Sequence, residues 1–183
     1  WTHGDFVSIR PITKQIVFHG RADGVLNPSG VRFGSAEIYR VLEGQFSKEI
    51  SDSICVGQRR PTDTDERVIL FLLMRPGMAF TPDLVARVKS AIRSELSPRH
   101  VPMFTFETHE IPVCAFVVKN KICKAELTHD IVIATVNLKK VELPVKQIVS
   151  GKIIKPSGTL LNPKSLDFYY QFAKVETLRE SKL

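Results

Sequence analysis

The residues best suited to chemistry lie in one glycine-rich stretch, residues 17–42. Between an apolar run and a helical pattern it holds Arg21, Arg32 and glycines at positions 20, 24, 30 and 34. Glycine permits positive φ angles and lets the backbone approach a ligand closely, and the arginine guanidinium suits phosphate or carboxylate. The stretch indicates an anion-binding loop. The alternative is a hairpin whose glycines only form turns and whose arginines are solvated.

The stretch follows two strand-like runs that predict a β-hairpin. Residues 6–10 alternate apolar and polar side chains, residues 11–14 form a turn, and residues 15–18 are the second strand. This pairing puts Asp5 at the same end of the hairpin as Arg21. The Asp5 carboxylate is then either a turn residue or an acceptor of hydrogen bonds from a diol.

Composition restricts the partners. The chain has 183 residues, a net charge of +7, and 26 Lys and Arg that are spread along it, so an anionic partner is expected and a nucleic-acid-binding arm is not. Its three cysteines show no Cys-x-x-Cys pairing, which favours reduced thiols in a cytoplasmic protein and no metal site. No apolar run predicts a membrane span, and the start shows no signal peptide.

The elements that must position these residues predict an α+β fold. Ser35 is the expected N-cap of a helix that reaches about residue 46, and residues 53–58 and 67–74 are expected strands. The second run is apolar on both faces, which predicts a central strand. Thr81 and Pro82 begin the clearest helix, to residue 95, and residues 103–107 form another strand. A small sheet flanked by helices and preceded by the hairpin follows.

The pattern is weaker toward the C-terminus. Residues 113–118 and 131–133 are candidate strands, and residues 141–149 carry apolar side chains at helical intervals, with Pro144 tolerable only in the first turn. A short last helix is expected after Asn162, its N-cap. The tail after residue 174 is charged and expected to fray.

Several motifs in this order resemble the C-terminal domain of the adenylate-forming acyl-CoA synthetases. They are Gly4-Asp5, Gly20-Arg21-x-Asp23, Gly30-x-Arg32 and Glu37-Ile38. Residues 26–39, 67–72, 96–102 and 145–152 look most like the acetoacetate–CoA ligase branch of this family. The resemblance covers residues 1–112 and 135–170. It implies the C-terminal lid fold of these enzymes and a reaction of acetoacetate, ATP and CoA that gives acetoacetyl-CoA, AMP and pyrophosphate.

The resemblance also implies roles for single residues. Asp5 matches the aspartate that binds the ribose hydroxyls, Arg21 the arginine that contacts the nucleotide, and Asp23 the hinge about which the lid rotates. Gly30 matches the glycine that lines the pantetheine tunnel, and Arg32 lies near the CoA phosphates or steadies the mobile domain. For Arg32 a surface ion pair is the alternative. Mg²⁺ is expected with ATP, bound mainly outside this chain.

Two lysines compete for the catalytic position, and Arg99 and His100 are weaker candidates for CoA binding. Residues 137–142 read Asn-Leu-Lys-Lys-Val-Glu and resemble the family's lysine hairpin, which makes Lys139 the match. Gly151-Lys152 resembles the generic Ser-Gly-Lys motif and is the rival. Leu138 departs from the glycine of the family at a tight turn, where leucine is disfavoured.

The sequence thus predicts four regions and an incomplete enzyme. Residues 1–22 are the hairpin and hinge approach, 23–112 the lid core, 113–134 an unrecognised insertion, and 135–183 the lysine loop, last helices and tail. The large N-terminal domain of the family has no counterpart here, so we expect a ligase fragment that is inactive alone. The alternative is a non-catalytic relative that binds an anion or an acidic protein.

Overall fold

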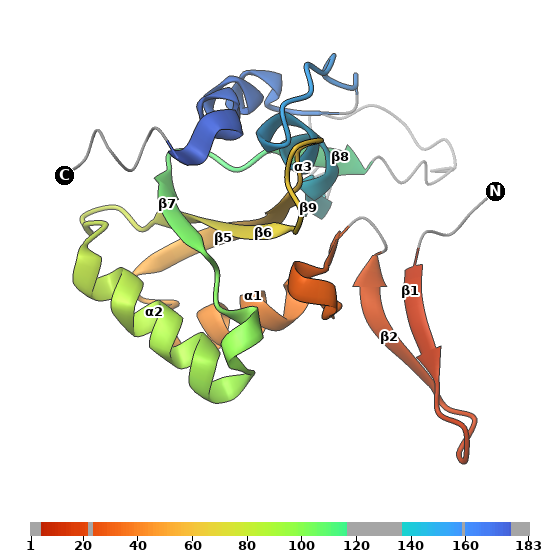
Figure 1. Ribbon diagram of the computed structural model, residues 1–183. Coiled ribbons are helices and arrows are strands. Elements are labelled where there is room, and N and C mark those ends of the chain that lie inside the picture. Colours follow the sequence, from red (N-terminus) through yellow and green to blue (C-terminus); the bar gives the residue numbers. More distant parts are fainter. Residues whose placement is uncertain (1–4, 22–23, 117–136, 159, 177–183) are drawn as a thin grey trace, which may run out of the picture.

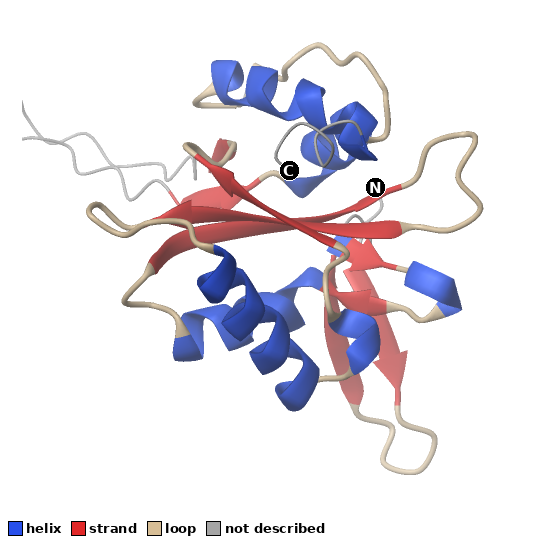
Figure 2. Ribbon diagram, turned by 60° about the vertical axis from the view of Figure 1, so that its left-hand side comes forward, coloured by secondary structure: helices blue, strands red, loops and turns tan. Residues whose placement is uncertain are grey.

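The core is a three-stranded sheet between two layers of helices. A computed structural model describes residues 5–21, 24–116, 137–158 and 160–176 (Figure 1). For residues 5, 6, 18–21, 114–116 and 137–139 it describes the backbone only. The sheet contains β5 (Ile50–Gln58), β6 (Arg67–Met74) and β7 (Phe104–Thr108), with β6 in the middle. Figure 2 shows the helices above and below it. The predicted α+β class is confirmed.

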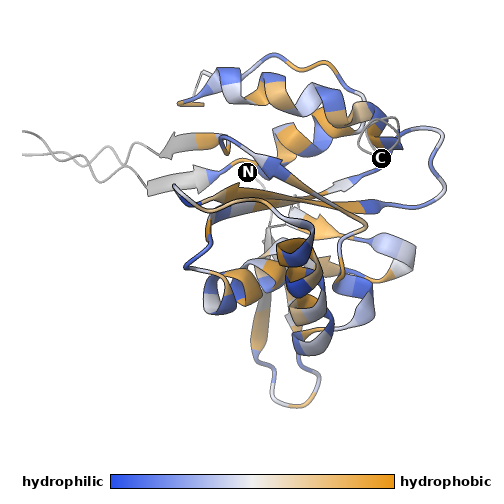
Figure 3. Cartoon of the chain, turned by 90° about the vertical axis from the view of Figure 1, so that its left-hand side faces the viewer, coloured by the Kyte–Doolittle hydropathy of each residue, from blue (hydrophilic) through white to orange (hydrophobic). Residues whose placement is uncertain are grey.

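Strand β6 is central because both of its faces are covered. It pairs antiparallel with β5 and parallel with β7, and its side chains from Val68 to Leu72 are at most 3% exposed. Hydrophobic residues concentrate along these strands in Figure 3. The prediction of a central strand over residues 67–74 is confirmed.

Two helices cover one face of the sheet. These are α1 (Ser35–Gln45) and α2 (Pro82–Glu95). Leu84, Val88 and Ile92 recur at helical spacing and are buried against the sheet. The Thr81 hydroxyl accepts a hydrogen bond from the Leu84 N–H at 3.2 Å, so the predicted start of this helix is confirmed.

The second face carries α3 (Glu142–Val149) and the 3₁₀ helix η4 (Pro163–Lys174). Their side chains enclose Phe71, whose ring meets those of Tyr169 and Phe172 edge-on with centroids 4.9 Å apart. Pro144 lies in the first turn of α3, as predicted.

The remaining elements are short, and the N-terminal hairpin projects away from the sandwich (Figure 1). They are β1 (Asp5–Ile9), β2 (Ile16–Arg21), β3 (Val25–Leu26), η2 (Pro28–Gly30), β4 (Phe33–Gly34), η3 (Pro98–His100), β8 (Val113–Phe116) and β9 (Asn137–Lys140). Strands β1 and β2 pair, as do β3 and β4, and β8 and β9.

Of three local expectations, two are wrong and one is confirmed. Gly34, not Ser35, is the N-cap of α1, and the Gly34 N–H donates to Glu37 Oε1 at 3.1 Å, while the Ser35 hydroxyl has a distant partner. Asn162 is the N-cap of η4, as predicted, but its side chain makes no capping bond, because its Oδ1 accepts from the Val113 N–H at 2.9 Å. Leu138 lies in an extended strand, where leucine carries no backbone strain.

The segment 113–134 is only partly described. Its first residues form β8, which pairs antiparallel with β9, so the candidate strand over 113–118 is confirmed in its first four residues. Residues 131–133 lie outside the described residues. The tail beyond residue 176 lies outside them as well.

Candidate functional site

The β1–β2 hairpin brings together the two residues predicted to bind nucleotide. In its antiparallel register Asp5 is the Cα partner of Arg21. A carboxylate residue and a guanidinium residue therefore share one position across the ladder, although they are sixteen residues apart in sequence. Asp23, the predicted hinge, lies outside the described residues.

The loop that carries Gly30 and Arg32 is held by two acids that sequence reasoning missed. The Asp65 carboxylate accepts hydrogen bonds from the Ser29 N–H and hydroxyl, each at 2.7 Å. These bonds, the side-chain one first, hold the pKa of Asp65 below its usual value. Glu66 Oε1 accepts from the Asn27 N–H at 2.9 Å.

Glu66 also ties this loop to α3. It is 8% exposed, and its Oε2 lies 3.0 Å from Lys146 Nζ. The anchoring fixes an unusual backbone, since Ser29 has φ 52° and Gly30 has φ 78°. No local signal reveals these partners, because Asn27 and Glu66 are 39 residues apart.

Gly30 and Arg32 lie on the open side of the loop. A Cβ atom at Gly30 would meet nothing within 4 Å, so its positive φ is what favours glycine here. Arg32 is exposed and forms no hydrogen bond or ion pair with any residue that the structure describes. The alternative of a surface ion pair is therefore not observed.

Arg99 is a second exposed arginine, and its neighbour His100 packs against Phe33, which follows Arg32 in the loop. The His100 ring packs against that of Phe33, with the centroids 4.1 Å apart and the ring planes tilted by 38°. Its Nδ1 lies 2.8 Å from Ser97 Oγ, and its Nε2 lies 3.4 Å from Glu37 Oε2. The imidazole is thus engaged within the fold, whereas the neighbouring Arg99 is exposed.

The predicted catalytic lysine lies in a strand of the short β8–β9 ribbon. The backbone of Lys139 pairs with that of Cys114. Its neighbour Lys140 forms an ion pair with Asp52, and the Lys140 Nζ lies 4.3 Å from the centroid of the Tyr39 ring. The strand is therefore anchored at the residue next to Lys139.

Lys152, the rival, has a different setting. It lies just past α3, after Gly151 at φ 89°. Its N–H donates to the Gln147 carbonyl at 3.0 Å, and its side chain is exposed. No hydrogen bond or ion pair of that side chain involves a described residue.

A polar cluster around Glu142 links α3 to α1, and sequence reasoning missed it. Glu142 Oε1 accepts from the Ser35 hydroxyl at 2.7 Å and from the Tyr39 hydroxyl at 2.5 Å. The Tyr39 oxygen accepts in turn from the Cys55 N–H at 2.9 Å. Burial, and then the Glu142 charge, raise the pKa of Tyr39 well above its usual value.

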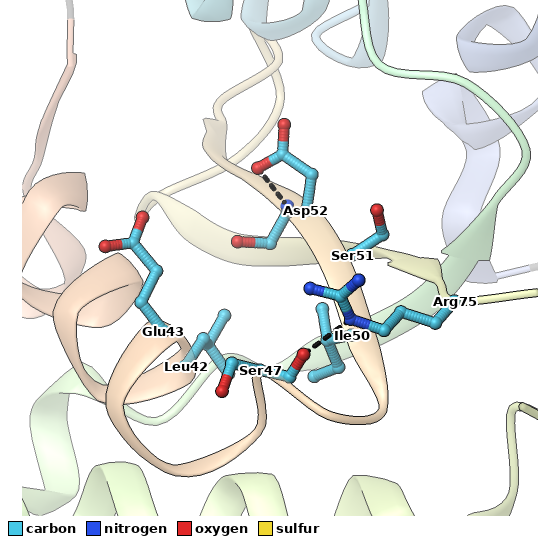
Figure 4. Close-up of a pocket in the computed structure, with 8 residues that line it drawn as sticks. Leu42, Glu43, Ser47, Ile50, Ser51, Asp52 and Arg75 are labelled. Atoms are coloured by element: carbon cyan, nitrogen blue, oxygen red, sulfur yellow. Dashed lines mark hydrogen bonds between the residues drawn. The ribbon is translucent and has the colours of Figure 1, made fainter.

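The pocket in Figure 4 does not include a predicted site residue. Its volume is about 170 Å³, and it is lined by Leu42, Glu43, Ser47, Ile50, Ser51, Asp52, Ser53 and Arg75. Arg75 Nε donates to the Ser47 carbonyl at 2.5 Å. The Asp52 carboxylate forms an ion pair with Lys140.

The described residues contain no candidate metal centre. No group of three or more His, Cys, Asp or Glu among them could hold a metal ion. Within the same part of the chain, no helix is long and apolar enough to cross a membrane. The buried thiol of Cys55 is free, and burial raises its pKa.

Comparisons with known proteins identify the relatives of this chain. No protein-family model matches. Acetoacetyl-CoA synthetase of Gallus gallus is 45% identical over 96% of the chain, and malonamoyl-CoA synthetase vrtB of Penicillium aethiopicum is 42% identical over 94% of it. The solved acetoacetyl-CoA synthetase of Streptomyces lividans superposes on 96% of the chain with a TM-score of 0.68 and 30% identity.

The chain spans about a quarter of the length of these relatives. It covers 23% of the Gallus gallus protein and 23% of the Streptomyces lividans chain. The matched part of the solved enzyme is its C-terminal region. By sequence and by structure, this chain is a relative of the acetoacetyl-CoA synthetases and corresponds to their C-terminal segment.

Proposed function

We propose that the chain is the C-terminal lid of an AMP-forming acetoacetate–CoA ligase and is inactive alone. The full reaction converts acetoacetate, ATP and CoA into acetoacetyl-CoA, AMP and pyrophosphate. The observation that carries the proposal is the 43–45% identity to several acetoacetyl-CoA synthetases over almost the whole chain. The malonamoyl-CoA synthetase is 42% identical. We therefore assign acetoacetate as the acyl substrate because most of the relatives are acetoacetyl-CoA synthetases. The cytosol and lipid or ketone-body metabolism are the proposed setting.

Asp5 and Arg21 are proposed to bind the nucleotide together. An ionised carboxylate accepts hydrogen bonds from a ribose diol, and a guanidinium donates charge-assisted bonds to a phosphate. Their pairing across the hairpin supports this assignment because one bound nucleotide would reach both residues. Asp23 is the proposed hinge. Mg²⁺ would come with ATP and be held mainly outside this chain.

The loop with Gly30 and Arg32 is proposed to face CoA. The support is an exposed guanidinium without a partner among the described residues, on a loop that Asp65 and Glu66 fix in place. A preorganised cation binds phosphate without first losing another contact. Arg99, next to His100, whose ring packs against Phe33, is the proposed second cation.

Lys139 is proposed to assist adenylate formation. Its ammonium would lie between the substrate carboxylate and the α-phosphate and offset their charges as they approach. After the lid rotates for thioester formation, the ammonium would lie away from the site. Lys152, which is exposed and beyond α3, is assigned no such part.

The first experiment uses the chain as it is. Without an acyl pocket or a phosphate-binding loop, the isolated chain should not convert ATP to AMP with acetoacetate. Its affinity for ATP should be weaker than about millimolar, or roughly −4 kcal/mol. Calorimetry that gives tighter binding, or detectable acetoacetyl-CoA, contradicts the proposal.

The second experiment supplies the missing part. In a hybrid enzyme, this chain replaces the matching segment of the Gallus gallus acetoacetyl-CoA synthetase. Lys139→Ala should slow adenylate formation by about a hundred- to a thousandfold and spare thioester formation from supplied acetoacetyl-adenylate. Lys152→Ala is the matched control and should leave both steps nearly unchanged. The reverse ranking would refute the assignment of Lys139.

The alternative function is that of a non-catalytic anion- or protein-binding domain. The net charge of +7 and the exposed Arg32 and Arg99 favour it. A folded hybrid that catalyses neither step, with an isolated chain that still binds an acidic polypeptide, would support this alternative. Loss of that binding in Arg32→Ala would locate it.

A further inference from the structure

We propose that Glu142 is a positioning residue that fixes the strand of Lys139 against the segment next to the predicted hinge. The inference rests on the proposed part of Lys139 in adenylate formation. Glu142 is the first residue of α3, two residues after the end of β9 and three residues beyond Lys139. Its carboxylate binds Tyr39, whose ring is also covered by Lys140 of the lysine strand, and lies against residue 24.

On the lysine side, two residues of the β9–α3 junction hold the same tyrosine. Glu142 Oε1 accepts from the Tyr39 hydroxyl, and the Lys140 Nζ lies over the Tyr39 ring at 4.3 Å from its centroid. A cation over an aromatic face and a charge-assisted hydrogen bond are both favourable. Because Tyr39 of α1 packs half-buried against the core and is bonded to the Cys55 N–H of β5, the junction is anchored to the core.

On the hinge side, the same carboxylate lies against Gly24. A Cβ atom at Gly24 would lie 2.5 Å from Glu142 Oε2 and 3.2 Å from Ser35 Oγ. Real Cβ atoms essentially never come as close as 2.5 Å to another heavy atom, so any side chain at residue 24 would displace the Glu142 carboxylate. Residue 24 is buried and follows Asp23, the predicted hinge.

The contacts form one continuous connection from residue 24 to the lysine strand. One carboxylate oxygen is held by two hydroxyls of α1, and the other faces residue 24. A shift of the backbone at residue 24 therefore displaces Glu142, and Glu142 is three peptide bonds from Lys139. We infer that this cluster sets the position of Lys139 relative to the hinge.

The first test measures amide hydrogen exchange in the isolated chain. Glu142→Ala removes both accepted hydrogen bonds, so the amides of residues 137–140 should exchange about tenfold faster or more. Glu142→Gln keeps an amide oxygen that both hydroxyls can reach, and exchange should change less than threefold. The β5–β6 amides report global stability, so the acceleration at residues 137–140 should exceed any acceleration at β5–β6 by about tenfold. Unaltered exchange at residues 137–140 in Glu142→Ala overturns the proposal.

The second test uses Gly24→Ala, which leaves every member of the cluster in place and pushes on Glu142. It should speed exchange at residues 137–140 in the same direction as Glu142→Ala. Gly44→Ala is the matched control, because a Cβ there meets nothing within 4 Å. Equal effects of the two alanines would overturn the connection to residue 24. If Glu142→Ala does not fold, the comparison of Gly24→Ala with Gly44→Ala still tests whether residue 24 is connected to the lysine strand.

The third test separates positioning from general stability. In the hybrid enzyme, Glu142→Ala and Gly24→Ala should slow adenylate formation by about tenfold and change thioester formation less than twofold, with Glu142→Gln close to the parent. Equal loss in both steps would show a merely structural residue and overturn the proposal.

The outcome is distinguishable from a failure of the proposed function. If Lys139→Ala itself shows no selective loss of adenylate formation, the function assigned to Lys139 fails. The anchoring of β9 by Glu142 is then decided by the exchange measurements alone. If exchange is also unaffected, both inferences are wrong.

Discussion

Tyr39→Phe is the sharpest test of the packing around Glu142. The substitution keeps the ring, and with it the contact with Lys140, and removes only the hydroxyl. That hydroxyl donates to Glu142 Oε1 at 2.5 Å and accepts from the Cys55 N–H at 2.9 Å. Cys55 is 1% exposed, so water cannot replace the lost acceptor.

The magnitude follows from these two bonds. A hydrogen bond to a charged group contributes about 1.5–3 kcal/mol, and a buried donor without a partner costs about 1–3 kcal/mol. Glu142 keeps its bond from Ser35 and is partly exposed, which reduces the first contribution. We expect the free energy of unfolding to fall by about 2–4 kcal/mol.

Urea denaturation at pH 7, followed by far-ultraviolet circular dichroism, measures this loss. The matched control is Tyr170→Phe. Tyr170 is half-buried, and its hydroxyl accepts from the Ile154 N–H at 3.1 Å and donates to the Ile154 carbonyl at 3.4 Å, with no charged partner. The control should lose about 1 kcal/mol or less. A loss in Tyr39→Phe no larger than in the control would refute the reasoning.

The same variant should change the response to alkali. The raised pKa of Tyr39 means that the folded state holds the phenolic proton more tightly than the unfolded state. This stabilisation is complete below about pH 10 and is lost as the pH rises above it. Tyr39→Phe should therefore lose less stability than the parent above about pH 10. Burial raises the pKa of Tyr169 to about 12, so the stability of the variant should still fall somewhat with pH in this range.

Three further perturbations test other parts of the structure. Gly57→Ala would put a Cβ 2.1 Å from Glu66 Oε1, so the free energy of unfolding should fall by about 1–3 kcal/mol. Gly44→Ala, at an exposed helix position, should not lower it. Equal free energies of unfolding in the two variants would contradict the packing argument. Asp65→Ala removes both acceptors of Ser29, and the amide of Ser29 should exchange faster with no change in β6; unaltered exchange would show that the loop does not need Asp65. Arg60 and Arg67 lower the pKa of Glu176 to about 2, so Glu176 stabilises the fold above about pH 4.5, and this stabilisation is lost as the pH falls toward 2. Glu176→Gln should therefore weaken the dependence of the melting temperature on pH between about 4.5 and 2. An unchanged dependence would refute this.

The sequence by itself determined the elements that depend on near neighbours. The apolar run of β6 needs cover on both faces whatever covers it. Thr81 and Pro82 begin α2 through bonds and angles within one turn. The glycine and arginine motifs, read in order, led to the right relatives for the same reason, because each motif is short and continuous.

Tertiary structure alone decided which polar side chains meet. Ser35 was predicted to cap its own helix, yet its hydroxyl donates to Glu142, 107 residues away. The choice depends on how α3 packs beside α1, which no periodicity encodes. Asp65 and Glu66 look like loop charges, but chain folding carries them to Ser29 and Asn27. Hydrogen bonds form between groups that packing makes adjacent and that burial deprives of water, so these partners become visible only in three dimensions.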